Sequence, residues 1–143
     1  MATAKSFEHL IRFYNVPGGG RLPLVTAGLV QPNGNRVALP LVFDTGASTT
    51  TLRADLFPLL GLNQWDQGQR VDTLTAGGTN PVAVYRYQAR IELFGKIVDC
   101  PVHLAQLPRN APYVGLLGRE AFFDEFGFGF WESTGELFAT AAP

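Results

Sequence analysis

The residue best placed to do chemistry is Asp44, which follows an apolar segment typical of a buried strand. Residues 41–48 read LVFDTGAS. A carboxylate at the end of a buried strand must be hydrogen-bonded, paired with another charge or kept protonated, because leaving it ionised and unpaired would cost several kcal/mol. Gly46 allows backbone N–H groups to point at this carboxylate. Asp44 is therefore a candidate catalytic residue, and an ordinary Asp-Thr-Gly turn without chemistry is the other interpretation of those three residues alone.

The other reactive residues lack the partners that other kinds of site require. His9 and His103 are too few for a zinc site without cysteines at metal-ligand spacing, so we expect no metal and no cofactor. Cys100 is the single cysteine, so no intrachain disulfide can form, and its apolar neighbours predict a buried structural thiol. The glycines at 18–20 lack the Lys-Ser/Thr that follows a phosphate-binding loop.

The composition is that of a globular protein with one core. The chain has 143 residues, of which 46% are hydrophobic and 16% charged, enough to bury the interior of a single domain. A formal net charge of −1 gives no broad positive surface, so neither nucleic acid nor a membrane is an expected partner. Sixteen glycines and ten prolines favour short strands joined by tight turns, so we expect a mainly β fold.

A hairpin is expected to carry the chain to Asp44. Two Val/Leu-rich runs, residues 22–30 and 36–43, flank Asn33-Gly34, and Asn-Gly between apolar runs is a strong hairpin signal. Further strands are predicted at 6–14, 71–75, 82–93, 96–104, 128–131 and 136–140, and short helices at 53–60 and 119–126. We expect one domain over residues 1–143, with an N-terminal strand and Gly-rich connection at 1–21 and the core at 22–140.

The N-terminal segment lacks the features of a secretory signal. Lys5, Glu8 and Arg12 interrupt the apolar run that a signal peptide needs, and no later stretch reaches membrane-spanning length. We therefore expect a soluble, cytoplasmic protein. Residues 1–4 could also be an artificial start on a fragment of a longer precursor.

Two motifs together resemble the retropepsin-type aspartic proteases, which include retroviral enzymes and soluble cellular and bacterial relatives. The first is FDTGAS at residues 43–48, and the second is LLGRE at residues 116–120. The resemblance extends over residues 22–138. It implies a closed β-barrel of the acid protease type with one or two short helices, and a flap hairpin whose tip would contain Gly77 and Gly78.

The resemblance also implies an obligate homodimer. Aspartic proteases hold one water between two Asp carboxylates that share a proton, so that one acts as base and the other as acid. This chain has one Asp-Thr-Gly and no second Asp-Thr-Gly or Asp-Ser-Gly, so two Asp44 side chains must meet across a two-fold axis. By resemblance, Thr45 and Gly46 support the catalytic loop, and the substrate contacts Ala47, Ser48, Gly77, Gly78 and Leu117. Val42, Leu74, Val82 and Leu117 fit pocket and core positions equally well.

The second motif departs from the retroviral pattern at one contact. Retroviral members usually carry Asp where this chain has Ser48, and the Arg of the second motif pairs with that Asp. Arg119 therefore lacks its expected partner, and it either pairs with Glu120, Asp124 or another carboxylate, or lies on the surface. Serine at this position is familiar from the cellular and bacterial relatives.

The resemblance implies an aspartic endopeptidase that hydrolyses peptide bonds in extended polypeptide segments by activating water between two Asp44 carboxylates. The alternative is a catalytically silent retropepsin-like module that dimerises or binds peptides. The intact Asp44-Thr45-Gly46 sequence favours the enzyme, because a scaffold has no need of it.

Overall fold

The hairpin that leads to Asp44 is present in the computed structural model, which describes residues 6–73 and 80–143. Strands β4 (Leu24–Val30) and β5 (Arg36–Phe43) pair antiparallel, with Leu24 opposite Val42. The turn between them closes through Gln31 N–H donating to the Asn35 carbonyl at 2.8 Å, and Gly34 has φ 87°. The Asn-Gly signal in the sequence therefore predicted this turn correctly.

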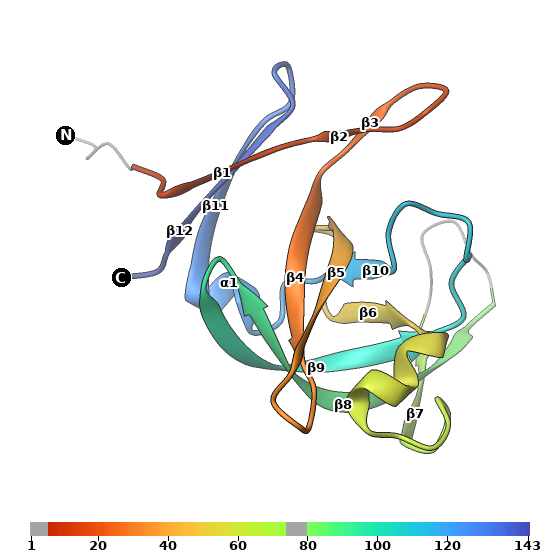
Figure 1. The fold of residues 1–143 in the computed structure, drawn as a ribbon. Helices are drawn as coiled ribbons and strands as arrows, with labels where there is room; N and C mark the ends of the chain where they lie inside the picture. Colours follow the sequence, from red (N-terminus) through yellow and green to blue (C-terminus); the bar gives the residue numbers. More distant parts are fainter. Residues whose placement is uncertain (1–5, 74–79) are drawn as a thin grey trace.

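Within the described residues, ten more strands and two short helices join this hairpin (Figure 1). The strands are β1 (His9–Arg12), β2 (Tyr14–Asn15), β3 (Arg21–Leu22), β6 (Thr50–Arg53), β7 (Gln69–Thr73), β8 (Val82–Leu93), β9 (Lys96–Ala105), β10 (Gly115–Leu117), β11 (Phe126–Trp131) and β12 (Glu136–Ala141). The helices are η1 (Ala54–Leu60) and α1 (Phe122–Glu125). No helix in the described ranges has the length and apolar character needed to cross a membrane.

Seven strands form one sheet in the order β4-β5-β10-β6-β9-β8-β7, and a further pairing of β4 with β8 closes it into a barrel. Strand β10 lies between β5 and β6, parallel to the first and antiparallel to the second. A second sheet, β1-β12-β11, joins the two ends of the chain. The closed, mainly β architecture agrees with the sequence-based expectation.

The insertion of β10 depends on two glycines that allow very close backbone contact. A Cβ on Gly115 would lie 2.2 Å from the Thr51 carbonyl oxygen, and one on Gly118 would lie 2.4 Å from the Thr49 carbonyl carbon. Real Cβ atoms do not approach backbone this closely, so a larger residue at either position would force the strands apart.

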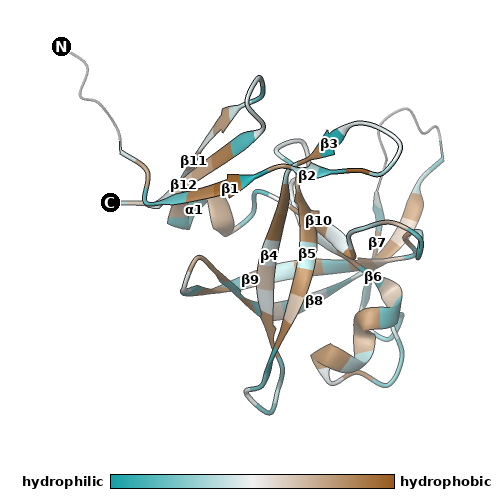
Figure 2. Cartoon of the chain, turned by 45° about the horizontal axis from the view of Figure 1, so that its top comes forward, coloured by the Kyte–Doolittle hydropathy of each residue, from teal (hydrophilic) through white to brown (hydrophobic). Residues whose placement is uncertain are grey.

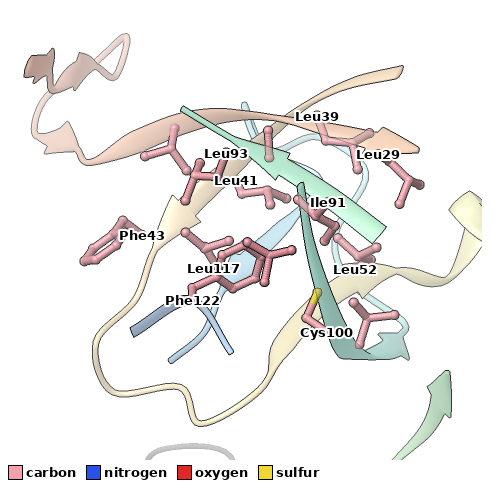
Figure 3. Close-up of a cluster of buried hydrophobic side chains, with 14 of the residues drawn as sticks. Leu29, Leu39, Leu41, Phe43, Leu52, Ile91, Leu93, Cys100, Leu117 and Phe122 are labelled. Carbon is pink, nitrogen blue, oxygen red and sulfur yellow. The ribbon is translucent and has the colours of Figure 1, made fainter. Parts of the chain in front are cut away.

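Alternating side chains of the barrel strands fill its interior. Figure 2 shows apolar residues along β4 and β5, and Figure 3 shows side chains from several strands pointing toward one another. Leu29, Leu41, Leu52 and Ile91 are completely buried. Cys100 is buried among them, as expected, and burial together with the Asp99 and Glu120 charges raises the pKa of its thiol to about 12.

Both predicted short helices are present, the first over nearly its predicted range and the second shorter than predicted. The segment predicted at 53–60 forms the 3₁₀ helix η1 rather than an α-helix; it contains Pro58, which has no N–H to donate, and Gly61 ends it with φ 75°. The helix predicted at 119–126 is only the four-residue α1, because Ala121 has φ 71°, which is outside the helical region, and the helix begins after it. The backbone conformation of Ala121 therefore marks where this helix starts.

Three strand assignments were missed or placed differently. Strands β6 and β10 were not predicted, and the segment predicted as one strand at 6–14 is divided between β1 and β2. The glycines at 18–20, all with positive φ, turn the chain between β2 and β3. Most of the predicted hairpin tip at 76–81 lies outside the described residues.

His103 on β9 is a buried histidine, with 8% of its surface exposed. Its Nε2 lies 3.4 Å from the Arg86 guanidinium on β8. Because arginine only donates, a hydrogen bond between them requires this ring nitrogen to accept, which only the neutral imidazole can do. Burial, and then the Arg86 charge, lower the pKa of His103 below its ordinary value of 6.5, while Glu120 opposes them.

We expect Gly118→Ala to lower the free energy of unfolding by about 1–3 kcal/mol or more, because the new methyl group meets fixed backbone. Urea denaturation measures this change. Gly127→Ala is the matched control, since its Cβ would have Thr140 Cγ2 as nearest atom at an ordinary 3.8 Å. Equal stability of the two variants would contradict the proposed close contact.

We expect His103→Gln to reduce the loss of stability in acid. The unfolded chain binds a proton at His103 near pH 6.5, whereas the folded chain resists it, so wild-type stability falls as pH drops below about 6.5. Gln can still accept from Arg86 and does not titrate. Between pH 7 and pH 5, the melting temperature of the wild type should therefore fall more than that of His103→Gln. Equal falls in the two proteins would refute this role of His103.

Candidate active site

Asp44 begins a tight loop at the end of β5, and three hydrogen bonds from backbone N–H groups hold it, two to carbonyl oxygens and one to its own carboxylate. Its N–H donates to the Leu117 carbonyl at 3.1 Å, and its carbonyl accepts from Ala47 N–H at 3.2 Å. Gly46 N–H donates to the carboxylate oxygen Oδ1 at 2.9 Å. A Cβ on Gly46 would lie only 3.3 Å from that oxygen, so a small residue suits this position. The carboxylate is therefore held at one oxygen by the backbone of its own loop.

The second sequence motif lies directly against this loop. Three N–H groups in a row donate to it: Gly118 to Thr50 Oγ1 at 3.0 Å, Arg119 to the Ala47 carbonyl at 3.0 Å and Glu120 to the Ser48 carbonyl at 2.8 Å. The Gly118 bond is buried. The fold thus joins the two motifs on which the resemblance rested, through backbone contacts rather than through the Arg119 side chain.

The loop presents its small residues outward. Thr45, Gly46 and Ser48 are exposed, and Asp44 and Ala47 are half-buried. Carboxylate and hydroxyl groups are therefore accessible at one surface of the barrel. A carboxylate in this setting can accept a proton from water, or donate one if it is protonated.

Other predicted contact residues are less close to this surface. Leu117 is completely buried, so the core alternative holds for its side chain and direct substrate contact does not. Val42 is half-buried beside Asp44, and Val82 is 41% exposed at the start of β8. Leu74, Gly77 and Gly78 lie outside the described residues, so their expected roles stay predictions.

Of the two expectations for Arg119, a carboxylate partner or a place on the surface, the structure agrees with the second. Its side chain is exposed, and it makes no ion pair within the ranges 6–73 and 80–143. Glu120 instead pairs with Arg86 on β8, with 3.1 Å between Oε2 and Nη2. Sequence reasoning did not identify Arg86, because nothing local to β8 indicates which segment its side chain meets.

Aromatic rings pack against Phe43, the last residue of β5 before the Asp44 loop. Phe43, which precedes Asp44, has its ring centroid 4.5 Å from that of Phe128 and 5.2 Å from that of Phe130. Phe123 stacks on it at 5.6 Å. These contacts connect the loop to β11 and α1. No group of three metal-ligating side chains occurs in the described part of the chain.

Comparison with known proteins agrees with this geometry. Residues 29–121, more than half of the chain, match the model of the family described as aspartyl protease. No curated protein matches the sequence.

Two solved structures are similar to this one. A retropepsin-like aspartic protease from Rickettsia conorii has a TM-score of 0.62 and 21% identity, and the match covers 99% of this chain and 98% of that one. The EIAV protease complexed with the inhibitor HBY-793 has a TM-score of 0.47 and 22% identity over 74% of this chain and 86% of that one. Since the family match includes both the Asp44 loop and the segment bonded to it, and the fold is retropepsin-like, this chain belongs to the aspartyl protease family.

Proposed function

We propose that the protein is an aspartic endopeptidase that hydrolyses peptide bonds in extended polypeptide segments. The observation that carries this proposal is the Asp44 carboxylate, bound at one oxygen by Gly46 N–H in an outward-facing loop. That loop is braced by the second motif, through Arg119 and Glu120 N–H groups. Such preorganisation is useful to a catalytic group, because the carboxylate need not reorient when substrate binds.

Catalysis requires a second carboxylate, and a second copy of the chain supplies it. The sequence contains one Asp-Thr-Gly. In the dimer, two Asp44 side chains share one proton across the two-fold axis. One removes a proton from the bound water, the water attacks the scissile carbonyl, and the other protonates the developing oxyanion and later assists departure of the amine. Activity should therefore fall once the pH is high enough to ionise both carboxylates.

Exposed aromatic residues beside the Asp44 loop support this dimer. Strand β11 is an edge of the sheet β1-β12-β11, so its outer backbone groups have no partner strand within the described part of that sheet. Phe130 and Trp131 on β11 are 40% and 62% exposed. Because Phe130 packs on Phe43, this apolar surface borders the residue before Asp44. A second copy covering it would bring the two loops near each other.

Substrate binding is proposed to use the outward-facing part of the loop. Ser48 and Gly46 offer groups to an extended peptide, which would bind by main-chain pairing. Thr45 is proposed to hydrogen-bond across the dimer axis, and Gly77 and Gly78 to approach the substrate from the other side. No cofactor or metal is needed for this reaction, because the two carboxylates provide both the base and the acid.

Asp44→Asn should abolish cleavage of an unstructured peptide library, with a loss of at least about 10²–10⁴-fold, because the dyad can no longer transfer protons. Mass spectrometry of the cleaved library measures this. Asp124→Asn, at an exposed aspartate on α1, is the matched control and should cleave normally. Cleavage retained by the Asp44→Asn variant would rule out the proposed mechanism, and dimerisation without any cleavage by wild type would favour the silent module.

Trp131→Lys should weaken the dimer at least about tenfold, since a buried interface Trp commonly contributes more than 1 kcal/mol. Sedimentation velocity across a concentration series gives the dissociation constant, and proteolytic activity should fall in parallel. Tyr14→Lys is the control, because Tyr14 is 41% exposed and lies outside the sheet β1-β12-β11. If Trp131→Lys dimerises like wild type, the interface lies elsewhere.

A further inference from the structure

Glu120, in the second motif, contacts both the Asp44 loop and strand β8. Its N–H donates to the Ser48 carbonyl at 2.8 Å, which fixes its backbone to the loop. Its carboxylate reaches away from the loop and lies 3.1 Å from the Arg86 guanidinium. One residue therefore connects the loop to β8.

Arg86 occupies a junction in the sheet. It lies opposite Gln69 on β7 and also opposite His103 on β9. From Arg86 back to Val82, β8 pairs with β7, and from Tyr85 onward it pairs with β9. Arg86 is therefore at the base of the β7–β8 hairpin, where the hairpin arms meet the barrel.

The guanidinium is held from two directions. Nη2 donates to Glu120 Oε2, and Nη1 lies 3.4 Å from Nε2 of the buried His103. The planar guanidinium presents its N–H groups in a fixed fork, so it can make both contacts at once in one defined orientation. His103 therefore limits the positions that the Arg86 guanidinium can take, and the guanidinium in turn limits the positions of the Glu120 carboxylate.

We propose that Arg86 and Glu120 are positioning residues of the proteolytic site, and that their ion pair sets the distance between the Asp44 loop and the base of the β7–β8 hairpin. The inference rests on the function proposed above. The pair is half-exposed, at 38% and 44%, so it adds little to global stability. Its effect is local, because it acts on the segment bonded to Ser48.

The consequence for catalysis is specific. Asp44 itself is fixed by Leu117 and Gly46, and neither contact involves the ion pair. Loosening the pair therefore leaves the proton-transfer groups in place and disturbs the Ser48 end of the loop, where substrate is proposed to bind. We expect KM to rise about five- to tenfold while kcat stays within about twofold.

The test compares Arg86→Gln, Glu120→Gln and the double variant in steady-state cleavage of one peptide. Because the two residues act as one pair, the double variant should have the same KM as either single variant. Arg90→Gln is the matched control: Arg90 lies on the same strand and pairs with Asp99 on β9 at 3.5 Å. It should leave KM unchanged. Unchanged KM in the single variants, or additive effects in the double variant, would overturn the proposal.

A second measurement does not depend on cleavage. Hydrogen exchange at the Glu120 amide, which donates to Ser48, should be about tenfold faster in Arg86→Gln than in wild type or Arg90→Gln. Unchanged exchange would overturn the positioning role. If wild type cleaves nothing but exchange still responds to Arg86, the proposed function fails and the positioning of the loop stands, so the two failures are distinguishable.

Discussion

The contact between the backbone at 115–118 and the backbone at 49–51 is the constraint on which the rest of the site depends. Gly115 and Gly118 let β10 enter the sheet between β5 and β6. Once it is there, the Leu117 carbonyl meets Asp44 N–H, and the following N–H groups meet Ala47 and Ser48. A carboxylate on a short, glycine-containing loop would otherwise have many conformations. Because Gly115 and Gly118 lack a Cβ atom, the backbone segments can approach closely, and this approach restricts the conformation of Asp44.

Much of the fold could be predicted from local signals. The Asn33-Gly34 turn identified the hairpin of β4 and β5, and unbroken runs of strand-forming residues identified β8 and β9 within one residue at their ends. The Asp44 loop was recognised because a charged residue directly after an apolar strand needs an explanation. In each case the information lay within a few consecutive residues, so no knowledge of the tertiary structure was required.

The parts that escaped prediction depend on contacts between distant segments. Strand β6 is only four residues long and is defined by its neighbours β9 and β10. The second helix is shortened because Ala121 has a positive φ of 71°, which no local pattern at this alanine predicts. Leu117 fitted pocket and core positions equally well until its burial decided between them. The Arg86–Glu120 pair connects β8 to the segment after β10, which the strand order β10-β6-β9-β8 brings together, and no local pattern carries that information.

The pairing of β1 with β12 has a consequence for the order of folding. These strands lie near opposite ends of the chain, with His9 opposite Ala139. Contacts of such long sequence separation close large loops and form late. During synthesis β1 therefore stays unpaired until β12 has been made, while the barrel strands between them can already pair. We therefore expect the sheet that carries Phe130 and Trp131 to be completed after the barrel.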